Sequence, residues 1–325
     1  MNKKITIIII LLIIALAAAL AIIFRHNIFY QPTVLNSNTN IQEKQYPPEN
    51  FTIAFIGDQG YGKNAKAVLQ LIKNEGADMV LHQGDFDYLD DPDKWDNQIN
   101  EILGKDFPYF ASVGNHDTKE WSGYQQKLID RLNHIEGENC SGDIGVNSSC
   151  IYKGIFFVLS GIGTLGSEHV EYLQEQLHLS DAPWKICSWH KNQKLMQVGG
   201  KGNEVGWEAY DTCRQEGAII ATGHEHSYSR TYLMNDFANQ AIASTSSTLE
   251  IEKGKTFAVV SGIAGHSIRG QNDKLATNPW WASVYTKNQN ANYGALFCNF
   301  NENKANCYFK DIDGNMPDKF VLIAK

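Results

Sequence analysis

The sequence has no excess of basic residues. Lysine and arginine number 28 against 36 aspartates and glutamates, and the formal net charge is −8. A general nucleic-acid-binding protein needs a basic face to neutralise phosphates, so the acidic balance argues against that class. No internal repeat is visible, and 43% of the 325 residues are hydrophobic, which is enough for a sizeable core. We therefore expect a globular protein without a nucleic-acid-binding surface.

Charged residues are missing from residues 5–24, which read ITIIIILLIIALAAALAIIF. The run has about the length that a helix needs to cross a bilayer. Lys3 and Lys4 precede it, so the positive-inside rule places residues 1–4 in the cytoplasm and the bulk of the chain outside it, in the periplasm or the extracellular space. A cleaved signal peptide is the alternative. Because the run continues past Ala19-Leu20-Ala21, we favour an uncleaved transmembrane signal anchor.

Polar residues without periodicity follow the apolar run. Residues 25–50 are typical of a stalk or linker, and residues 51–325 are predicted to form the folded domain. In this domain three apolar runs alternate with segments of helical spacing near 64–74, 93–104 and 121–132; the runs are FTIAFIG, ADMVLHQ and YFASVG. Three further apolar runs and a β-rich tail follow; these runs are IFFVLSG, WKICSWH and GAIIATG. The alternation indicates βαβ units, and the tail indicates antiparallel pairing. We predict an α/β domain of two packed sheets with helices outside.

The six cysteines include no CxxC pair. Six cysteines allow fifteen pairings, and six reduced thiols are an alternative. An exported domain lies in an oxidising compartment, where disulfides form. We therefore expect the three couples Cys140–Cys150 around a polar loop, Cys298–Cys307 around a hairpin, and Cys187–Cys213.

Polar side chains follow five of the apolar runs. The motifs are Gly57-Asp58-Gln59-Gly60, Gly84-Asp85-Phe86-Asp87-Tyr88, Gly114-Asn115-His116-Asp117, Trp189-His190 and Gly223-His224-Glu225-His226. The carboxyl ends of parallel strands are where ligand sites form in α/β sheets. Carboxylates and imidazoles suit iron, zinc and manganese, and one carboxylate can bridge two ions roughly 3.5–4 Å apart. The pattern therefore predicts a metal pair in one cleft.

Together the motifs resemble those of the calcineurin-like metallophosphoesterases and, more narrowly, the purple acid phosphatases. The resemblance spans about Phe51 to Arg230, and SGIAGH, ending at His266, is a weaker match to the family pattern. Gly60 stands where most metallophosphoesterases have a histidine two residues after the first aspartate. Tyr88 stands three residues after the bridging aspartate, as in the purple acid pattern. The resemblance implies a metallophosphoesterase-like α-β-β-α sandwich of two mixed sheets.

The same resemblance implies which residues bind the two ions. A ferric ion, which a phenolate favours, would be held by Asp58, Asp85, Tyr88 and His226. A divalent iron, zinc or manganese would be held by Asp85, Asn115, His190 and His224. The cations would convert a bound water to hydroxide at mild pH, and the hydroxide would attack the phosphorus of a phosphomonoester. His116 is not a ligand in the pattern and would protonate the leaving group or orient the phosphate.

The chain departs from the family pattern in one place. Purple acid phosphatases usually carry another histidine some residues after the WH-type ligand, but KNQKLMQVGGKGNEVG has none. Lys191, Asn192 or Lys201 are candidates to hold phosphate in its place. Arg230 either binds phosphate or pairs with a carboxylate, and His266 is a candidate for the rim of the cleft.

The implied function is that of a membrane-anchored, extracytoplasmic phosphatase acting on a phosphorylated small molecule. The acidic net charge does not oppose this, because a local metal cluster can outweigh it. One alternative is a phosphodiesterase or nucleotidase on the same fold. Another is a catalytically silent surface protein with a structural metal pair.

Overall fold

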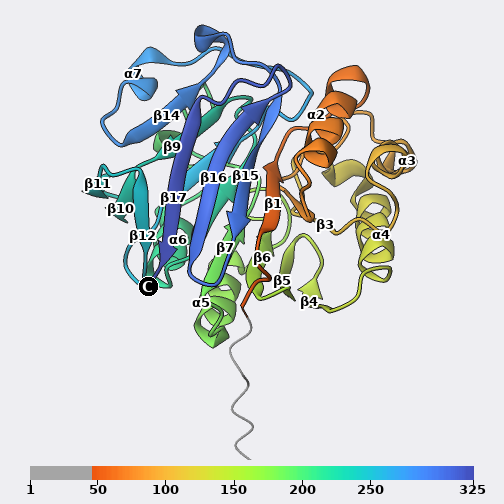
Figure 1. The fold of residues 1–325 in the computed structure, drawn as a ribbon, viewed down its shortest axis with the longest axis horizontal. Coiled ribbons are helices and arrows are strands. Elements are labelled where there is room, and N and C mark those ends of the chain that lie inside the picture. Colours follow the sequence, from red (N-terminus) through yellow and green to blue (C-terminus); the bar gives the residue numbers. More distant parts are fainter. Residues whose placement is uncertain (1–45) are drawn as a thin grey trace, which may run out of the picture. The chain divides into compact units, whose positions relative to one another are not determined.

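Seven strands form the first sheet, sheet A, of the computed structural model, which describes residues 46–325. β1, β2 and β3 run parallel to one another, whereas β15 pairs antiparallel with β1. Sheet A thus joins the βα units at the start of the domain to the β-rich C-terminal part (Figure 1). The order of its strands is β12 (Thr248–Ile251), β17 (Asp318–Ala324), β16 (Lys304–Asp311), β15 (Gly294–Phe300), β1 (Phe51–Ile56), β2 (Met79–His82) and β3 (Tyr109–Ala111).

Eight strands form sheet B. Their order is β14 (Trp281–Tyr285), β9 (Tyr228–Thr231), β13 (Ala258–Ser261), β8 (Ile219–Thr222), β7 (Trp184–Ser188), β6 (Ile155–Ser160), β5 (Asn147–Tyr152) and β4 (Glu138–Asp143). The four central strands β6, β7, β8 and β13 are parallel, and the strands on both sides of them are antiparallel. A separate two-stranded sheet consists of β10 (Leu233–Asp236) and β11 (Ala241–Ser244).

Helices cover the outer faces of both sheets. α2 (Lys63–Asn74), α3 (Pro92–Ile102) and α4 (Trp121–Leu132) pack on sheet A, and α5 (His169–Leu179) and α6 (Trp207–Gln215) pack on sheet B. Figure 1 shows the first three, orange to yellow, beside β1 and β3. The short elements are α7 (Asp273–Ala276), η1 (Thr118–Glu120), η2 (Lys194–Met196) and η3 (Lys287–Gln289).

The core is divided into three layers by the two sheets, because successive side chains of a strand point to opposite faces. In β1, Phe55 belongs to the apolar cluster between the sheets, whereas Ile56 belongs to the cluster under α2. In sheet B, Val158 and Cys187 face the cluster with Leu173 of α5. The architecture is therefore the α-β-β-α sandwich that the resemblance implied.

The strands and helices that were predicted from periodicity are present, and α4 has the expected bounds. Two expectations were wrong. The polar segment between Cys140 and Cys150 is the β4–β5 hairpin rather than a loop, since its solvent face tolerates polar residues. The tail is also not wholly antiparallel, because β13 pairs parallel with β8 and β12 with β17. All three expected disulfide couples are formed.

The expected membrane-spanning run at residues 5–24 and most of the stalk at 25–50 lie outside the described residues. Within residues 46–325, no helix has the length and apolar character that crossing a membrane requires.

Candidate metal centre

The side chains of the five motifs gather where parallel strands of both sheets end. Asp58 follows β1, Asp85 and Tyr88 follow β2, Asn115 and His116 follow β3, His190 follows β7, and His224 and His226 follow β8. The amide of Asp58 donates to the carbonyl of Gly84 at 3.0 Å, which joins neighbouring strand ends of sheet A. The amide of His224 donates to Asp58 Oδ2 at 2.7 Å, which joins the two sheets. Both sheets therefore contribute to one cluster.

Asp58, Tyr88 and His226 form what we call the first half-site. The Tyr88 hydroxyl donates to Asp58 Oδ1 at 2.9 Å, and its oxygen lies 3.3 Å from His226 Nε2. His226 Nε2 lies 3.2 Å from Asp58 Oδ1. Burial, together with the carboxylates of Asp58 and Asp85, raises the pKa of Tyr88 far above its usual value. A phenolate at this position therefore needs a cation beside it.

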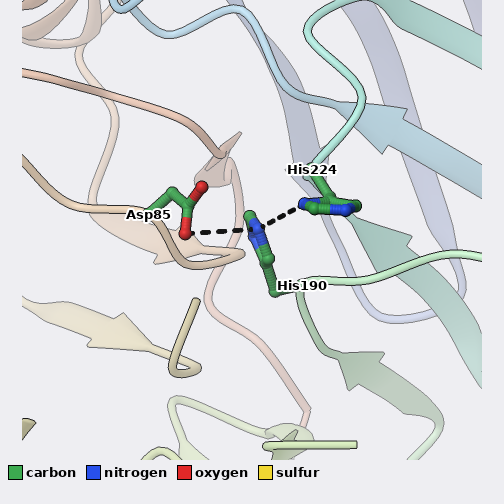
Figure 2. A group of neighbouring side chains, drawn as sticks. All are labelled: Asp85, His190 and His224. Carbon is green, nitrogen blue, oxygen red and sulfur yellow. Dashed lines mark hydrogen bonds and ion pairs between the residues drawn. The ribbon is translucent and has the colours of Figure 1, made fainter. Parts of the chain in front are cut away.

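His190 and His224 contact each other in what we call the second half-site, to which we assign Asn115 because the next residue, His116, donates its amide to Asp85 Oδ1 at 2.9 Å. His190 Nε2 lies 3.0 Å from His224 Nδ1 and 3.3 Å from Asp85 Oδ1. Figure 2 shows Asp85, His190 and His224 pointing toward one another, and their ligand atoms all lie within 4.8 Å of each other. Asn115 Oδ1 is buried without a hydrogen-bond partner among the described residues. A buried oxygen of this kind suits a metal ligand.

Asp85 lies beside both half-sites. Its side chain lies 3.3 Å from His190 Nε2 of the second half-site. Its backbone carbonyl accepts from the amide of Gln59, the residue after Asp58 of the first half-site, at 3.0 Å. Burial acts to raise the pKa of Asp85, but the charge and hydrogen bond of His190 and the backbone N–H of His116 outweigh it, so the pKa is lowered. The carboxylate is therefore ionised at neutral pH and has the charge that a bridging ligand requires.

Each histidine turns one ring nitrogen toward the cluster and the other toward an outer partner. The outer contacts are His190 Nδ1 to the carbonyl of Gln83 at 2.7 Å, His224 Nε2 to Glu204 Oε2 at 2.8 Å, and His226 Nδ1 to the Ser267 hydroxyl. Carbonyl and carboxylate oxygens only accept, so in the first two rings the outer nitrogen carries a proton and the inner one can offer its lone pair to a metal ion. The two inner nitrogens lie 3.0 Å apart and therefore need a cation between them, either a proton or a metal ion. The donor set therefore fits a dinuclear metal centre.

Four residues of the cluster have a left-handed backbone. The φ angles are 57° at Asp58, 60° at Asp85, 61° at Tyr88 and 68° at His224. Residues other than glycine seldom adopt this conformation, and it is found where surrounding structure enforces it. Gly114 of the GNHD motif is required for lack of space, since a Cβ there would lie 2.1 Å from the backbone nitrogen of Asp85.

The family follows from a comparison with protein-family models. The model described as calcineurin-like phosphoesterase matches residues 51–228, which is more than half of the chain. The chain belongs to the calcineurin-like phosphoesterase family. It is similar to purple acid phosphatase 22 of Arabidopsis thaliana, with 23% identity over 205 residues that cover 57% of this chain and 46% of that protein. The chain thus spans less than half the length of this curated relative.

Two solved structures share the fold over most of this chain. Purple acid phosphatase PPD1 from yellow lupin (Lupinus luteus) matches with a TM-score of 0.65 and 17% identity, covering 86% of this chain and 55% of that one. GAP50 of Plasmodium matches with a TM-score of 0.59 and 14% identity, covering 86% of this chain and 90% of that one. At these identities the likeness establishes the fold of the calcineurin-like phosphoesterase domain.

The neighbouring residues His116 and Asp117 differ in exposure and in their contacts. The His116 side chain is exposed beside the cluster, with its ring centroid 4.6 Å from that of Tyr88, and its amide donates to Asp85 Oδ1 at 2.9 Å. Asp117 is buried and accepts from the amides of Asp85, Phe86 and Gly114 at 2.7–2.9 Å. Sequence reasoning gave Asp117 no role, and its adjacency to His116 was the only signal. It fixes the loop that carries Asp85.

Glu204 was also missed. It contacts His224, and its Oε1 lies 3.2 Å from Lys191 Nζ. Asn192 is fully buried, and its amide bonds the carbonyl of Gly223 and the hydroxyl of Thr222. Asn192 therefore braces the end of β8 and is not available to hold phosphate, contrary to one expectation.

The two remaining candidates, His266 and Arg230, differ in exposure. His266 is exposed and stacks on Tyr88 with ring centroids 3.5 Å apart, so it lies beside the first half-site. Arg230 is 3% exposed and makes a bidentate pair with Asp318 at 2.7 and 2.8 Å. Arg230 therefore pairs with a carboxylate and does not bind phosphate.

Proposed function

We propose that this chain is a membrane-anchored, extracytoplasmic phosphatase that hydrolyses phosphomonoesters of small molecules at a dinuclear metal centre. Membership of the calcineurin-like phosphoesterase family supports phosphoester chemistry. The observation that carries the proposal is that the two half-sites meet at Asp85, because a carboxylate shared by two donor sets suits two ions rather than one.

In this proposal each half-site takes one ion together with Asp85. The first half-site would hold Fe(III), since the Tyr88 phenol loses its proton only beside a strong cation and phenolates favour ferric iron. The second half-site offers one amide oxygen and two imidazoles and would hold divalent iron, zinc or manganese. When bound, the metal pair supplies an activated water and neutralises phosphate oxygens.

The residues around the ions would prepare the substrate. His116 is exposed beside Tyr88 and is not needed as a ligand, so its ring is free to donate a proton to the leaving oxygen or to orient the phosphate. Lys191 and Lys201 are the partly buried cations of the segment that lacks the second family histidine. Lys201 has the better access to a phosphate, because Lys191 is already paired with Glu204.

A direct assay tests this function. The full-length protein should contain close to two metal ions per chain and hydrolyse an aryl phosphate monoester, with loss of activity after chelation and recovery on adding metal. Faster hydrolysis of a bis-aryl phosphate diester would instead favour a phosphodiesterase. Two bound ions with neither activity would identify a silent protein with a structural metal pair.

The location is tested separately. The anchor hypothesis rests on the uncharged run at residues 5–24, preceded by Lys3 and Lys4. The protein should fractionate with membranes, and protease added outside intact cells or spheroplasts should digest the domain. Recovery in the soluble fraction without residues 1–24 would indicate a cleaved signal peptide.

A further inference from the structure

The two ring nitrogens of His224 have partners of opposite kind. His224 Nδ1 faces His190 Nε2 at 3.0 Å, inside the second half-site. His224 Nε2 faces Glu204 Oε2 at 2.8 Å, outside it. An ionised carboxylate can only accept a hydrogen bond, so the proton of a neutral His224 ring is placed on Nε2. The lone pair is then on Nδ1, the nitrogen that faces the metal ligands.

Glu204 is held in place by contacts that lead back to the segment that carries His224. The amide of Glu204 donates to the carbonyl of Asn192 at 3.1 Å. The side-chain amide of Asn192 in turn donates to the carbonyl of Gly223 at 2.6 Å, immediately before His224. The Glu204 carboxylate is therefore carried by a segment fixed to the end of β8, unlike a freely rotating surface glutamate.

The charge of Glu204 is balanced by a second partner. Its Oε1 lies 3.2 Å from Lys191 Nζ, and the two side chains are 27% and 19% exposed. A lone carboxylate at this distance from the metal ligands would repel an anionic substrate. Because each oxygen of Glu204 has its own partner, the residue can orient His224 without presenting an unpaired negative charge to the cleft.

We propose that Glu204 is a positioning residue that holds His224 in the Nε2-protonated tautomer and thereby directs Nδ1 at the second metal ion. The inference deepens the proposed function, since it concerns the same metal centre. Glu204 acts through His224 rather than as a ligand, because it contacts the ring nitrogen that points away from His190. Outer partners of this kind typically change metal affinity by roughly 10- to 100-fold when they are removed.

The first test observes the tautomer without any metal. The full-length apo protein, labelled with ¹⁵N-histidine, is examined by two-bond ¹H–¹⁵N correlation at neutral pH, with His224→Gln used to assign the signal. The wild type should show a protonated Nε2 at His224, and Glu204→Ala should show a mixture of tautomers. A wild-type ring protonated on Nδ1 would overturn the proposal, whatever the variants do.

The second test measures zinc binding by competition with a chromophoric chelator. Glu204→Ala should weaken one of the two zinc sites by roughly 10- to 100-fold, and Glu204→Gln should restore much of the affinity, since its amide oxygen still accepts from Nε2–H. Glu208→Ala, an exposed glutamate at the start of α6, is the matched control and should bind as the wild type does. Unchanged affinity in a folded Glu204→Ala protein would overturn the proposal.

The outcomes separate this inference from the proposed function. If the wild type binds no pair of zinc ions, the proposed function fails, while the tautomer still decides the role of Glu204. If the pair binds and both Glu204 variants match the wild type, only the positioning role fails. Should Glu204→Ala not fold, Glu204→Asp replaces it, because a side chain one methylene shorter withdraws the carboxylate from Nε2 and should weaken the same site.

Discussion

The two half-sites are supported by different kinds of contact. In the first, Tyr88 lies against the ring of His266, with centroids 3.5 Å apart, and the backbone of His266 bonds the carbonyl of Asp58 at 3.2 Å. In the second, His190 and His224 are each oriented by a hydrogen bond of 2.7–2.8 Å to an outer oxygen. The Tyr88 ring of the first half-site is therefore held largely by packing, whereas the two imidazoles of the second are oriented by directional bonds.

This difference has a physical reason in the donor groups. A phenol oxygen has no second polar atom through which an outer partner could orient it, so its ring must be held by its faces. An imidazole has a second nitrogen, and a hydrogen bond there sets both the ring orientation and the tautomer. Substitutions around Tyr88 should therefore act through the packing of its ring, and those around His190 and His224 through hydrogen bonding.

The largest effect is expected from removing the residue that both half-sites share. Asp85→Ala should lose both ions and reduce aryl phosphate hydrolysis below detection, because neither donor set is complete without this carboxylate. Metal analysis and the assay are carried out alongside Asp106→Ala, an exposed aspartate outside the cluster. Retained activity in metal-depleted Asp85→Ala protein would refute the shared site.

Tyr88→Phe should affect the ion of the first half-site and leave the ion of the second in place. The iron-loaded wild type should show a broad visible charge-transfer band from phenolate bound to ferric iron, and the variant should lose this band. The divalent ion should stay, because Asn115, His190 and His224 are untouched. Visible spectra and metal analysis are the measurements. Tyr88 is not a ligand if the iron-loaded wild type is colourless or if the band survives the substitution.

Gly60→Ala tests the packing behind the first half-site. Gly60 has a φ of 72°, and a Cβ there would lie 3.1 Å from Cα and Cβ of His266. A left-handed alanine costs roughly 1–2 kcal/mol, and the close contact adds to this cost. Urea denaturation should show a larger loss than Gly314→Ala, where φ is 88° and a Cβ has nothing within 4 Å. Equal losses would mean that the contact with His266 is unimportant.

His266→Ala is expected to have the smallest effect. Losing an aromatic stack costs about 0.5–1.5 kcal/mol, and a freed Tyr88 ring should shift or broaden the charge-transfer band while both ions remain bound. His266→Phe keeps a stacking ring and should keep the wild-type band. If both variants shift the band equally, the imidazole nitrogens rather than the stack influence Tyr88.

The sequence predicted the parts of the site that depend on strand ends. Asp58 and Asp85 could be expected to lie near each other because both directly follow buried strands of one parallel set. Glu204 could not be predicted in the same way, since it lies in an aperiodic segment between β7 and α6 whose path depends on tertiary packing. The partner of Arg230 could not be predicted either, because Asp318 is 88 residues away and belongs to the other sheet.

The β4–β5 hairpin shows the same limit for the fold. Polarity suggested a loop there, but backbone pairing with β5 and the disulfide between Cys140 and Cys150 do not require apolar side chains on the solvent face. Periodicity detects a strand only when one or both of its faces are buried. The inner strands of both sheets meet that condition, and β4 at the edge of sheet B does not.

The left-handed backbone of the clustered residues bears on how this protein would respond to selection for heat resistance. Such conformations cost on the order of 1–3 kcal/mol each in residues other than glycine. A glycine in place of Tyr88 or His224 would relieve that cost while deleting a proposed ligand. A library screened for melting temperature alone should therefore accumulate glycine at these positions and yield inactive proteins of higher melting temperature. A screen that also requires activity should retain the strained residues.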